Sequence, residues 1–343
     1  MKIAILTDTH IGVKNGDESL LKYQEDFFLN QFFPYCKANQ IKTIFHLGDF
    51  FDNRKHLNVN VLERAKHMFL YPLLDHGMDM RIIAGNHDVY YKNTNRVNSL
   101  LQFFNVVEVN VIDNHACDIP IGGKTFGFVP WINEDNHDQI TEFLKGSMAD
   151  MILGHFEFSG FKMMKGAETV SHGESPEMVK RFKKVLSGHY HTRSEMGNVR
   201  YLGTPYEMSW ADSEDPKGFY VLDTETMELE EVRNHSQMFR TLHYNGGISV
   251  QGLTEDSRIR LIVTNDKGLD DFVRECEEVI GVKDLKIIEN TLTESDESEI
   301  DDVVNSTSDT ITMIERCCDE INFEDKERLK LRFQELYTKA YSI

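Results

Sequence analysis

The sequence predicts an α/β fold in which short parallel strands alternate with helices. Apolar runs at residues 3–6, 43–47 and 80–84 are typical of buried strands, and each run is followed by a polar loop. Residues 18–39, between the first two runs, carry apolar side chains at helical spacing. Strands connected through a helix pair in parallel, and their carboxyl ends form the edge where α/β sheets bind ligands. We therefore expect a ligand site built from the loops that follow these strands.

The other elements of this domain follow the same patterns. Two more apolar runs, at residues 150–153 and 184–186, also end in polar loops. Residues 97–104 and 176–184 have helical spacing. Short strands with turn residues between them are expected at residues 106–111, 116–119, 125–129, 199–202 and 218–222. We assign all these elements to one domain at residues 1–235.

A second, smaller α+β domain is expected at residues 236–290. It contains strand patterns and one helical pattern, at residues 239–244, 258–263, 285–288 and 269–280.

The last stretch of the chain has a different composition. Residues 291–309 are acidic and rich in serine and threonine, which predicts a linker or the solvated start of a helix. Residues 310–343 contain two amphipathic helix patterns. A helix pair at this position usually docks on its own domain, but a solvated tether before it favours docking on another chain.

The charge of the chain limits how it can bind nucleic acid. The formal net charge is −20, from 57 acidic and 37 basic residues. This balance argues against a protein that grips nucleic acid with a broad basic surface of its own. Residues 291–325 hold twelve acidic residues and one basic residue, so over half of the excess lies there. The residues before 291 therefore repel a polyanion much less than the net charge of the whole chain suggests.

Other composition features predict a cytoplasmic protein. No apolar run approaches the roughly 18 residues of a membrane span, and no apolar leader follows the first lysine. The five cysteines lack C-x-x-C spacing, which fits reduced thiols better than a disulfide framework or a thiolate metal site.

Five strand-end loops carry the residue types of a metal site. In chain order they are Asp8-x-His10, Gly48-Asp49, Gly85-Asn86-His87-Asp88, Gly154-His155 and Gly188-His189-x-His191. Turn formation explains the glycine, aspartate and asparagine residues but not the imidazoles. Two cations roughly 3.5–4 Å apart can clamp a phosphate, and they need carboxylate, imidazole and amide ligands of this kind. The mixture without thiolate suits Mn²⁺, Fe or Zn²⁺ better than Mg²⁺.

The five loops together resemble the signature of the calcineurin-like metallophosphoesterases. Within that superfamily, Tyr201-Leu-Gly-Thr-Pro-Tyr-Glu-Met-Ser-Trp210 is similar to a segment of the SbcD-type DNA repair nuclease subunits, a group that includes those of T-even phages. The resemblance implies a β-sandwich core flanked by helices, a capping domain at residues 236–290 and ATPase-binding helices at residues 310–343.

The resemblance also implies a role for each loop residue. Asp8, His10, Asp49 and His191 would surround one metal ion, and Asp49, Asn86, His155 and His189 the other. His87 would be the catalytic histidine that protonates the leaving sugar oxygen. Asp88 would either orient His87 or hold the loop as a turn former. Many family members carry histidine where this chain has Asp52, a departure that could alter metal tuning or the balance of activities.

The activity implied by the resemblance is that of a manganese-dependent, two-metal DNA nuclease. It would be a 3′-to-5′ exonuclease on duplex DNA and an endonuclease on single strands, acting in DNA recombination, repair and replication. Its partners would be an SMC-like coiled-coil ATPase and a second copy of itself within a heterotetramer, in a host cytoplasm if the chain is phage-encoded. Lys92 and Arg96 are candidate DNA contacts. The alternatives are a phosphomonoesterase or protein phosphatase, and a non-catalytic scaffold.

Overall fold

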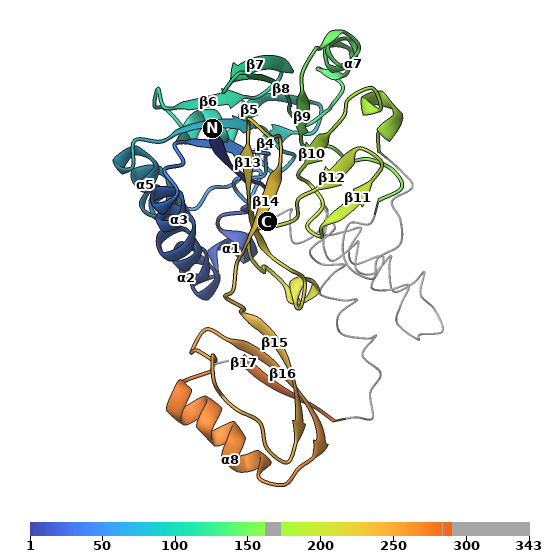
Figure 1. Ribbon diagram of the computed structural model, residues 1–343. Coiled ribbons are helices and arrows are strands. Elements are labelled where there is room, and N and C mark those ends of the chain that lie inside the picture. The colour runs from blue at the N-terminus through green and yellow to red at the C-terminus, as the bar shows by residue number, and fades with distance from the viewer. Residues whose placement is uncertain (162–172, 283, 290–343) are drawn as a thin grey trace, which may run out of the picture. The chain divides into compact units, whose positions relative to one another are not determined.

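The protein is described from a computed structural model, which covers residues 1–161, 173–282 and 284–289. The expected acidic linker at residues 291–309 and the expected helical segment at 310–343 lie outside the described residues. The chain divides into two compact units, and Figure 1 shows their elements. The first unit comprises Met1–Met208, Asp212–Arg240 and Thr254–Arg258. None of the helices in the described ranges combines the length and apolar composition needed to cross a lipid bilayer.

The first unit contains two six-stranded sheets. The first sheet has the order β14-β13-β1-β2-β3-β6, in which β1, β2, β3 and β6 are parallel and β13 and β14 are antiparallel additions. Its strands are β1 (Lys2–Leu6), β2 (Thr43–His46), β3 (Asp79–Ile83), β6 (Val109–Ile112), β13 (Gly218–Asp223) and β14 (Leu229–Arg233).

The second sheet has the order β11-β12-β10-β9-β8-β7, with β8, β9, β10 and β12 parallel. Its strands are β7 (Cys117–Ile121), β8 (Lys124–Val129), β9 (Met151–Gly154), β10 (Val185–Ser187), β11 (Ser194–Met196) and β12 (Val199–Tyr201).

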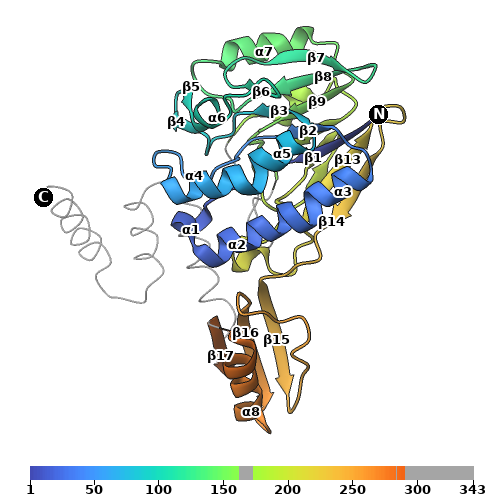
Figure 2. The same cartoon turned by 90° about the vertical axis from the view of Figure 1, so that its left-hand side faces the viewer.

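Helices connect the parallel strands, as the sequence predicts. Between β1 and β2 and between β2 and β3, the chain forms α1 (Val13–Gly16), α2 (Glu18–Asp26), η1 (Phe27–Phe32), α3 (Phe33–Ala38), α4 (Val59–Ala65), η2 (Lys66–Leu70) and α5 (Tyr71–Asp75). These helices lie over one face of the first sheet (Figure 2). Helix α7 (His137–Gly146) connects β8 to β9 and packs on the second sheet.

Successive side chains of strand β1 enter two different hydrophobic cores. In β1, Ile3 and Ile5 belong to a core shared with residues of the second sheet such as Phe128 and Leu153. Ala4 and Leu6 belong to the core beneath the helices. Because successive side chains of a strand point to opposite faces, the fully buried β1 lies between these two cores. The predicted α/β fold with a β-sandwich core flanked by helices is confirmed.

Two expected helices are shorter than predicted, at residues 97–104 and 176–184. The helix expected at residues 97–104 begins only at Ser99 in α6 (Ser99–Phe103), because residues 94–98 pair with β4 (Val89–Tyr91) as strand β5 (Thr94–Asn98). Asn98 then caps α6 by accepting a hydrogen bond from Leu101 N at 2.9 Å.

The helix expected at residues 176–184 is a single short turn, η3 (Pro176–Val179). The chain turns after it, and the Arg181 side chain donates to the backbone oxygens of Leu144 and Lys145 at the end of α7.

The second unit has its own sheet and core. Strands β15 (Phe239–Asn245), β16 (Arg258–Asn265) and β17 (Asp284–Glu289) form a sheet in that order, accompanied by α8 (Leu269–Arg274) and η5 (Glu275–Ile280). Its core includes the buried side chains Tyr244, Ile259, Leu261, Phe272, Cys276 and Val282. The strands and the helix expected in this region are present.

Candidate metal centre

The backbone turns sharply at the strand-end loops of the first unit. Asp8, His10, Asp49 and His189 have φ angles of 50°, 40°, 55° and 88°. Positive φ is uncommon for residues other than glycine, and such strained conformations cluster at functional sites. Four of the seven candidate metal ligands therefore lie in a backbone conformation that the surrounding structure must stabilise.

The loops hold one another through backbone hydrogen bonds. The His10 backbone N–H donates to Asp49 O at 3.0 Å, and the His189 N–H donates to the Asp8 carboxylate at 3.0 and 3.1 Å. The Asp49 carboxylate accepts the His87 N–H at 2.7 Å. Two carboxylates therefore fix neighbouring loops and keep further oxygen atoms directed into the space between them.

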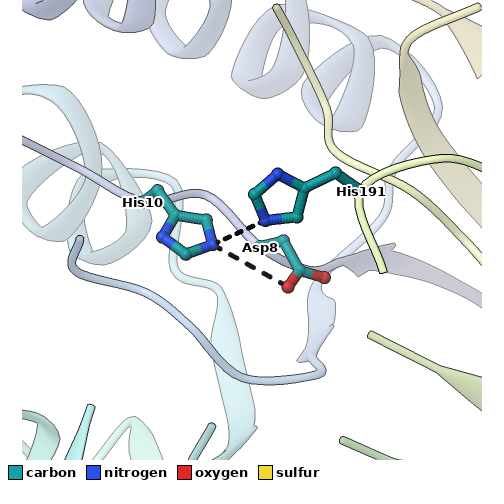
Figure 3. A group of neighbouring side chains, drawn as sticks. All are labelled: Asp8, His10 and His191. Carbon is teal, nitrogen blue, oxygen red and sulfur yellow. Dashed lines mark hydrogen bonds and ion pairs between the residues drawn. The ribbon is translucent and has the colours of Figure 1, made fainter. Parts of the chain in front are cut away.

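One cluster of side chains gathers around His10. Its Nε2 lies 3.2 Å from His191 Nε2, 3.9 Å from Asp8 Oδ1 and 3.6 Å from Asp49 Oδ2. Figure 3 shows this nitrogen directed at both His191 and Asp8. The other ring nitrogen, Nδ1, lies 3.3 Å from Asp52 Oδ1. Asp52 thus holds the outer side of the ring, in the way carboxylates commonly orient metal-binding histidines.

A second cluster gathers around Asn86. Its Oδ1 lies 3.0 Å from His155 Nε2 and 2.9 Å from His189 Nδ1. Asp49 Oδ2 lies 3.3 Å from the same nitrogen of His155. The Nδ1 of His155 is engaged by Leu47 O at 2.7 Å, which assigns the hydrogen to that nitrogen. Asp49 is therefore shared by both clusters.

The donor set fits divalent cations. A neutral His155 ring with its hydrogen on Nδ1 presents a lone pair at Nε2, and this lone pair faces the oxygens of Asn86 and Asp49. Acceptors that face one another need positive charge between them, supplied by a proton or by a metal ion. Burial opposes a charged ring, but Asp49 raises the pKa of His155 to about 9. Groups of carboxylate and imidazole atoms within 4.8 Å of one another could hold a metal on each side of Asp49.

The His10 cluster shows the same demand for positive charge. Burial disfavours a charged His10 ring, yet the bond to Asp52 and the nearby carboxylates raise the pKa of His10 to about 9. Burial and the neighbouring His10 lower the pKa of His191 to about 3. One imidazole of the pair thus carries the charge that a metal ion would replace.

His87 lies beside the first cluster. Its ring centroid is 4.7 Å from that of His10, and its Nδ1 is engaged by Asp52 O at 2.5 Å. Burial lowers the pKa of His87. With Nδ1 occupied, Nε2 is the ring nitrogen open to a substrate.

The Asp88 carboxylate accepts hydrogen bonds from backbone N–H groups. Its Oδ2 accepts the N–H groups of Asp49 at 2.8 Å and Gly85 at 2.9 Å, and its Oδ1 accepts that of Phe50 at 3.0 Å. The His87 ring is held by a different residue. Of the two roles expected for Asp88, orienting His87 or holding the loop, these backbone bonds favour loop holding.

The two candidate DNA contacts lie outside both clusters. Arg96 in β5 pairs with Asp135 through Nε to Oδ2 at 2.8 Å and Nη2 to Oδ1 at 3.2 Å. Its guanidinium is thus already engaged by a carboxylate. Lys92 lies in the turn between β4 and β5.

Two residues near the clusters had no signal in the sequence. The partly buried Trp131 ring lies 5.1 Å from the ring of His189. The buried Lys217 donates to His191 O at 3.1 Å and to the carboxylates of Asp212 and Asp215 at 2.7 and 2.8 Å. Trp131 follows strand β8 by two residues but lies in none of the five motifs, and Lys217 directly precedes β13.

Comparisons with known proteins agree with the resemblance seen in the motifs. Residues 1–193 match the family Calcineurin-like phosphoesterase. The chain is 35% identical over 345 residues to Exonuclease subunit 1 of Enterobacteria phage T4, with 99% of each chain covered. It is 22% identical over 258 residues to a subunit of the nuclease SbcCD from Staphylococcus epidermidis, with 67% of each covered.

A solved dimetal phosphatase from Danio rerio is 11% identical, with a TM-score of 0.41 and coverage of 64% of this chain and 91% of that chain. A likeness at this level carries no argument about the site. The family match covers more than half of the chain, and the phage protein is similar over its full length. The chain belongs to the calcineurin-like phosphoesterase family.

Proposed function

We propose that the chain is a divalent-metal-dependent DNA nuclease, a hydrolase that acts on phosphodiester bonds. The observation that carries this proposal is the pair of carboxylate and imidazole clusters that share Asp49. The similarity to a phage exonuclease subunit and to a bacterial nuclease subunit supports DNA as the substrate. Manganese is the metal we expect, because the ligand set mixes imidazole with carboxylate.

Each of the two clusters would bind one cation. Asp8, His10 and His191 would hold one ion and Asn86, His155 and His189 the other, with Asp49 between them. When bound, such a pair neutralises the phosphate oxygens and activates water as the nucleophile. The chain's own contribution is to orient the imidazoles, which Asp52 does for His10 and Leu47 O for His155.

His87 is the proposed acid for the departing sugar oxygen. Because Asp52 O accepts the hydrogen on Nδ1, the acid is the doubly protonated imidazolium, and its second proton lies on Nε2. Transfer of that proton avoids expulsion of an unstabilised alkoxide and typically contributes roughly 10²–10⁴-fold in rate.

The test of this role is His87→Ala. The variant should bind both metal ions, measured by calorimetry and elemental analysis, and should lose roughly 10²–10⁴-fold in DNA cleavage. His67→Ala is the matched control, because His67 is exposed on η2 and its neighbours are Glu63 and Tyr71, not the candidate ligands. Wild-type turnover in His87→Ala would refute the role.

A parallel assay separates the nuclease from its rivals. Linear DNA and a phosphomonoester are each incubated with the Mn²⁺-loaded chain. Cleavage of DNA alone supports the nuclease, and turnover of the monoester alone would make the chain a phosphatase. A chain that binds no metal after Mn²⁺ loading would be a scaffold. The products on labelled duplex and single-stranded DNA test the proposed 3′-to-5′ exonuclease and endonuclease activities.

The proposed assembly is a homodimer bound to a coiled-coil ATPase of the SMC-like class. The bacterial relative is named as one subunit of a nuclease, which supports a partner chain here. The net charge of −20 supports a partner that supplies much of the DNA grip. Co-purification of such an ATPase with the intact chain, and its loss with a chain ending at Glu289, would support the proposed docking segment at residues 310–343.

A further inference from the structure

An exposed pair of tyrosines lies on the hairpin formed by β4 and β5. Tyr90 and Tyr91 are 40% and 50% exposed, and their ring centroids are 4.8 Å apart in an edge-to-face arrangement. The hairpin follows His87 and Asp88 directly in the chain. Large aromatic rings displayed side by side to solvent are typical of a binding surface.

The hairpin is fixed to the candidate metal centre at three points. Arg54 Nε donates to Val89 O at 3.2 Å, and Ser99 N donates to Asp88 O at 2.8 Å. The fully buried Asn95 donates to Trp131 O at 2.8 Å. The first two bonds tie the ends of the hairpin to the loops after β2 and β3, and the third ties its second strand to the backbone of Trp131, whose ring lies beside His189.

The charge around the hairpin suits a polyanion. Residues 89–107 contain Lys92 and Arg96 and no acidic residue, although the whole chain has a net charge of −20. Arg96 is paired with Asp135, so Lys92 is the cation that the hairpin itself adds. Arg54 adds a cation beside the first strand, and it forms no ion pair with an acidic residue in the part of the chain that the structure describes. Exposed aromatic rings with cations beside them are the features of surfaces that bind single-stranded nucleic acid.

We propose that the β4–β5 hairpin binds the unpaired bases of single-stranded DNA on the Tyr90 and Tyr91 rings and so delivers the strand to the metal centre. Each base presents an aromatic face, so stacking on tyrosine holds a strand without regard to sequence. Arg54 binds a phosphate of the same strand. This inference rests on the proposed nuclease function and concerns its proposed action on strands with unpaired bases.

The experiment measures binding of the full chain to a labelled single strand of about 12 nucleotides by fluorescence anisotropy, with chelator present to prevent cleavage. The second probe is the same strand with abasic sugars in place of nucleosides, which keeps the phosphates and removes the bases. The variants are Tyr90→Ala, Tyr91→Ala and their combination, with Tyr→Phe and Tyr→Leu at both positions. Tyr71→Ala on α5 is the matched control, because Tyr71 is 41% exposed and lies on a different element.

Each alanine substitution should raise the Kd for the normal strand by roughly fivefold to a hundredfold, the usual range for loss of one stacked base. The phenylalanine variants keep the rings and should bind like the wild type, whereas the leucine variants should bind like alanine. The abasic strand should bind the wild type and the double alanine variant equally weakly. Tyr71→Ala should leave the Kd unchanged.

Three results would overturn the inference. The first is wild-type affinity in the double alanine variant. The second is equal affinity of the wild type for the normal and abasic strands. The third is a double alanine variant whose molecular mass in light scattering differs from that of the wild type while its Kd for the strand is unchanged. The last result would identify the hairpin as a contact between protein chains. A separate cleavage assay of the wild type with Mn²⁺ tests the proposed nuclease function itself. A chain that binds single strands through these rings but cuts no DNA would refute the nuclease function and leave the binding role of the hairpin standing.

Discussion

At the scale of single residues, Asp52 has the most distinct proposed role. Its carboxylate lies 3.3 Å from His10 Nδ1, and its backbone oxygen engages His87 Nδ1. One residue thus orients a candidate ligand and the proposed acid. Carboxylates in this position fix the histidine tautomer and commonly contribute 10- to 100-fold in metal affinity.

We predict that Asp52→Ala lowers the affinity for one of two Mn²⁺ ions by roughly 10- to 100-fold, because His10 loses the group that orients it. The affinity for the other ion should stay close to wild type, because His155 is held by Leu47 O. Calorimetric titration with Mn²⁺ resolves the two sites. Asp75→Ala, at an exposed position in α5, is the control. Equal weakening of both sites would show that Asp52 acts on the whole pocket.

The motifs predicted which side chains meet but not what holds them. All seven candidate ligands and His87 follow from residue type at strand ends, because parallel strands bring their carboxyl ends together. The contact of Asp52 with His10 depends on a φ of 40° at His10, which residue type does not indicate. The role of Lys217 depends on a contact with His191 from a distant loop. Such contacts follow from the completed fold.

At the scale of elements, Asp88 joins the loop after β2 to the loop after β3. Its two oxygens accept the backbone N–H groups of Gly85, Asp49 and Phe50, and its side chain is fully buried. A Cβ atom at Gly85 would lie 2.2 Å from Asp49 Oδ1, so the loops approach so closely that only glycine fits there. The position of Asp49 therefore depends on both Asp88 and Gly85.

We predict that Asp88→Asn lowers the free energy of unfolding by about 1–3 kcal/mol, because the amide presents N–H groups where backbone donors need an acceptor. Metal affinity should fall with it, since Asp49 is displaced. Chemical denaturation and Mn²⁺ titration measure the two effects, with the exposed Asp138→Asn as control. Loss of turnover with unchanged stability and metal affinity would instead indicate a direct role in the reaction.

Elements with strong periodicity were predictable, and the hairpin was not. The strands before the metal loops and the helical run at residues 18–38 have clear apolar patterns. In β4 and β5 the pattern is weak, because Tyr90 and Tyr91 are both exposed and the pairing is irregular between Val89 and Tyr91. Buried asparagines replace apolar residues in β5, so the core-facing side of that strand carries no hydrophobic signal.

At the scale of the whole molecule, buried acids determine how stability responds to pH. Glu207 is buried, and its Oε2 accepts the backbone N–H groups of Met238 and Phe239 at 2.7 and 2.9 Å. Burial raises the pKa of Glu207 to about 7 from 4.5, despite those bonds. The folded state therefore binds a proton that the unfolded state has released across this range.

We predict that this group's contribution to stability is complete below pH 4.5 and is lost as the pH rises through about 7. The slope from one such group reaches about 1.4 kcal/mol per pH unit. Glu207→Gln removes the titration and should flatten the profile between pH 5 and about 7 in denaturant unfolding. If the unfolding free energy of Glu207→Gln changes with pH as steeply as that of the wild type, other acidic residues cause the pH dependence.

The two compact units have separate hydrophobic cores, which predicts two unfolding transitions. Leu261 is fully buried in the core of the second unit, and Leu186 is fully buried between the sheets of the first. Replacing either leucine with alanine removes packed atoms and typically costs about 2–5 kcal/mol. Because the two side chains share no core, each loss should shift only the transition of its own unit. Leu261→Ala should leave Mn²⁺ binding intact, since every candidate ligand lies in the first unit. Scanning calorimetry of both variants, with Mn²⁺ titration alongside, measures this separation, and one transition that shifts equally in both would show that the chain unfolds as a single cooperative body.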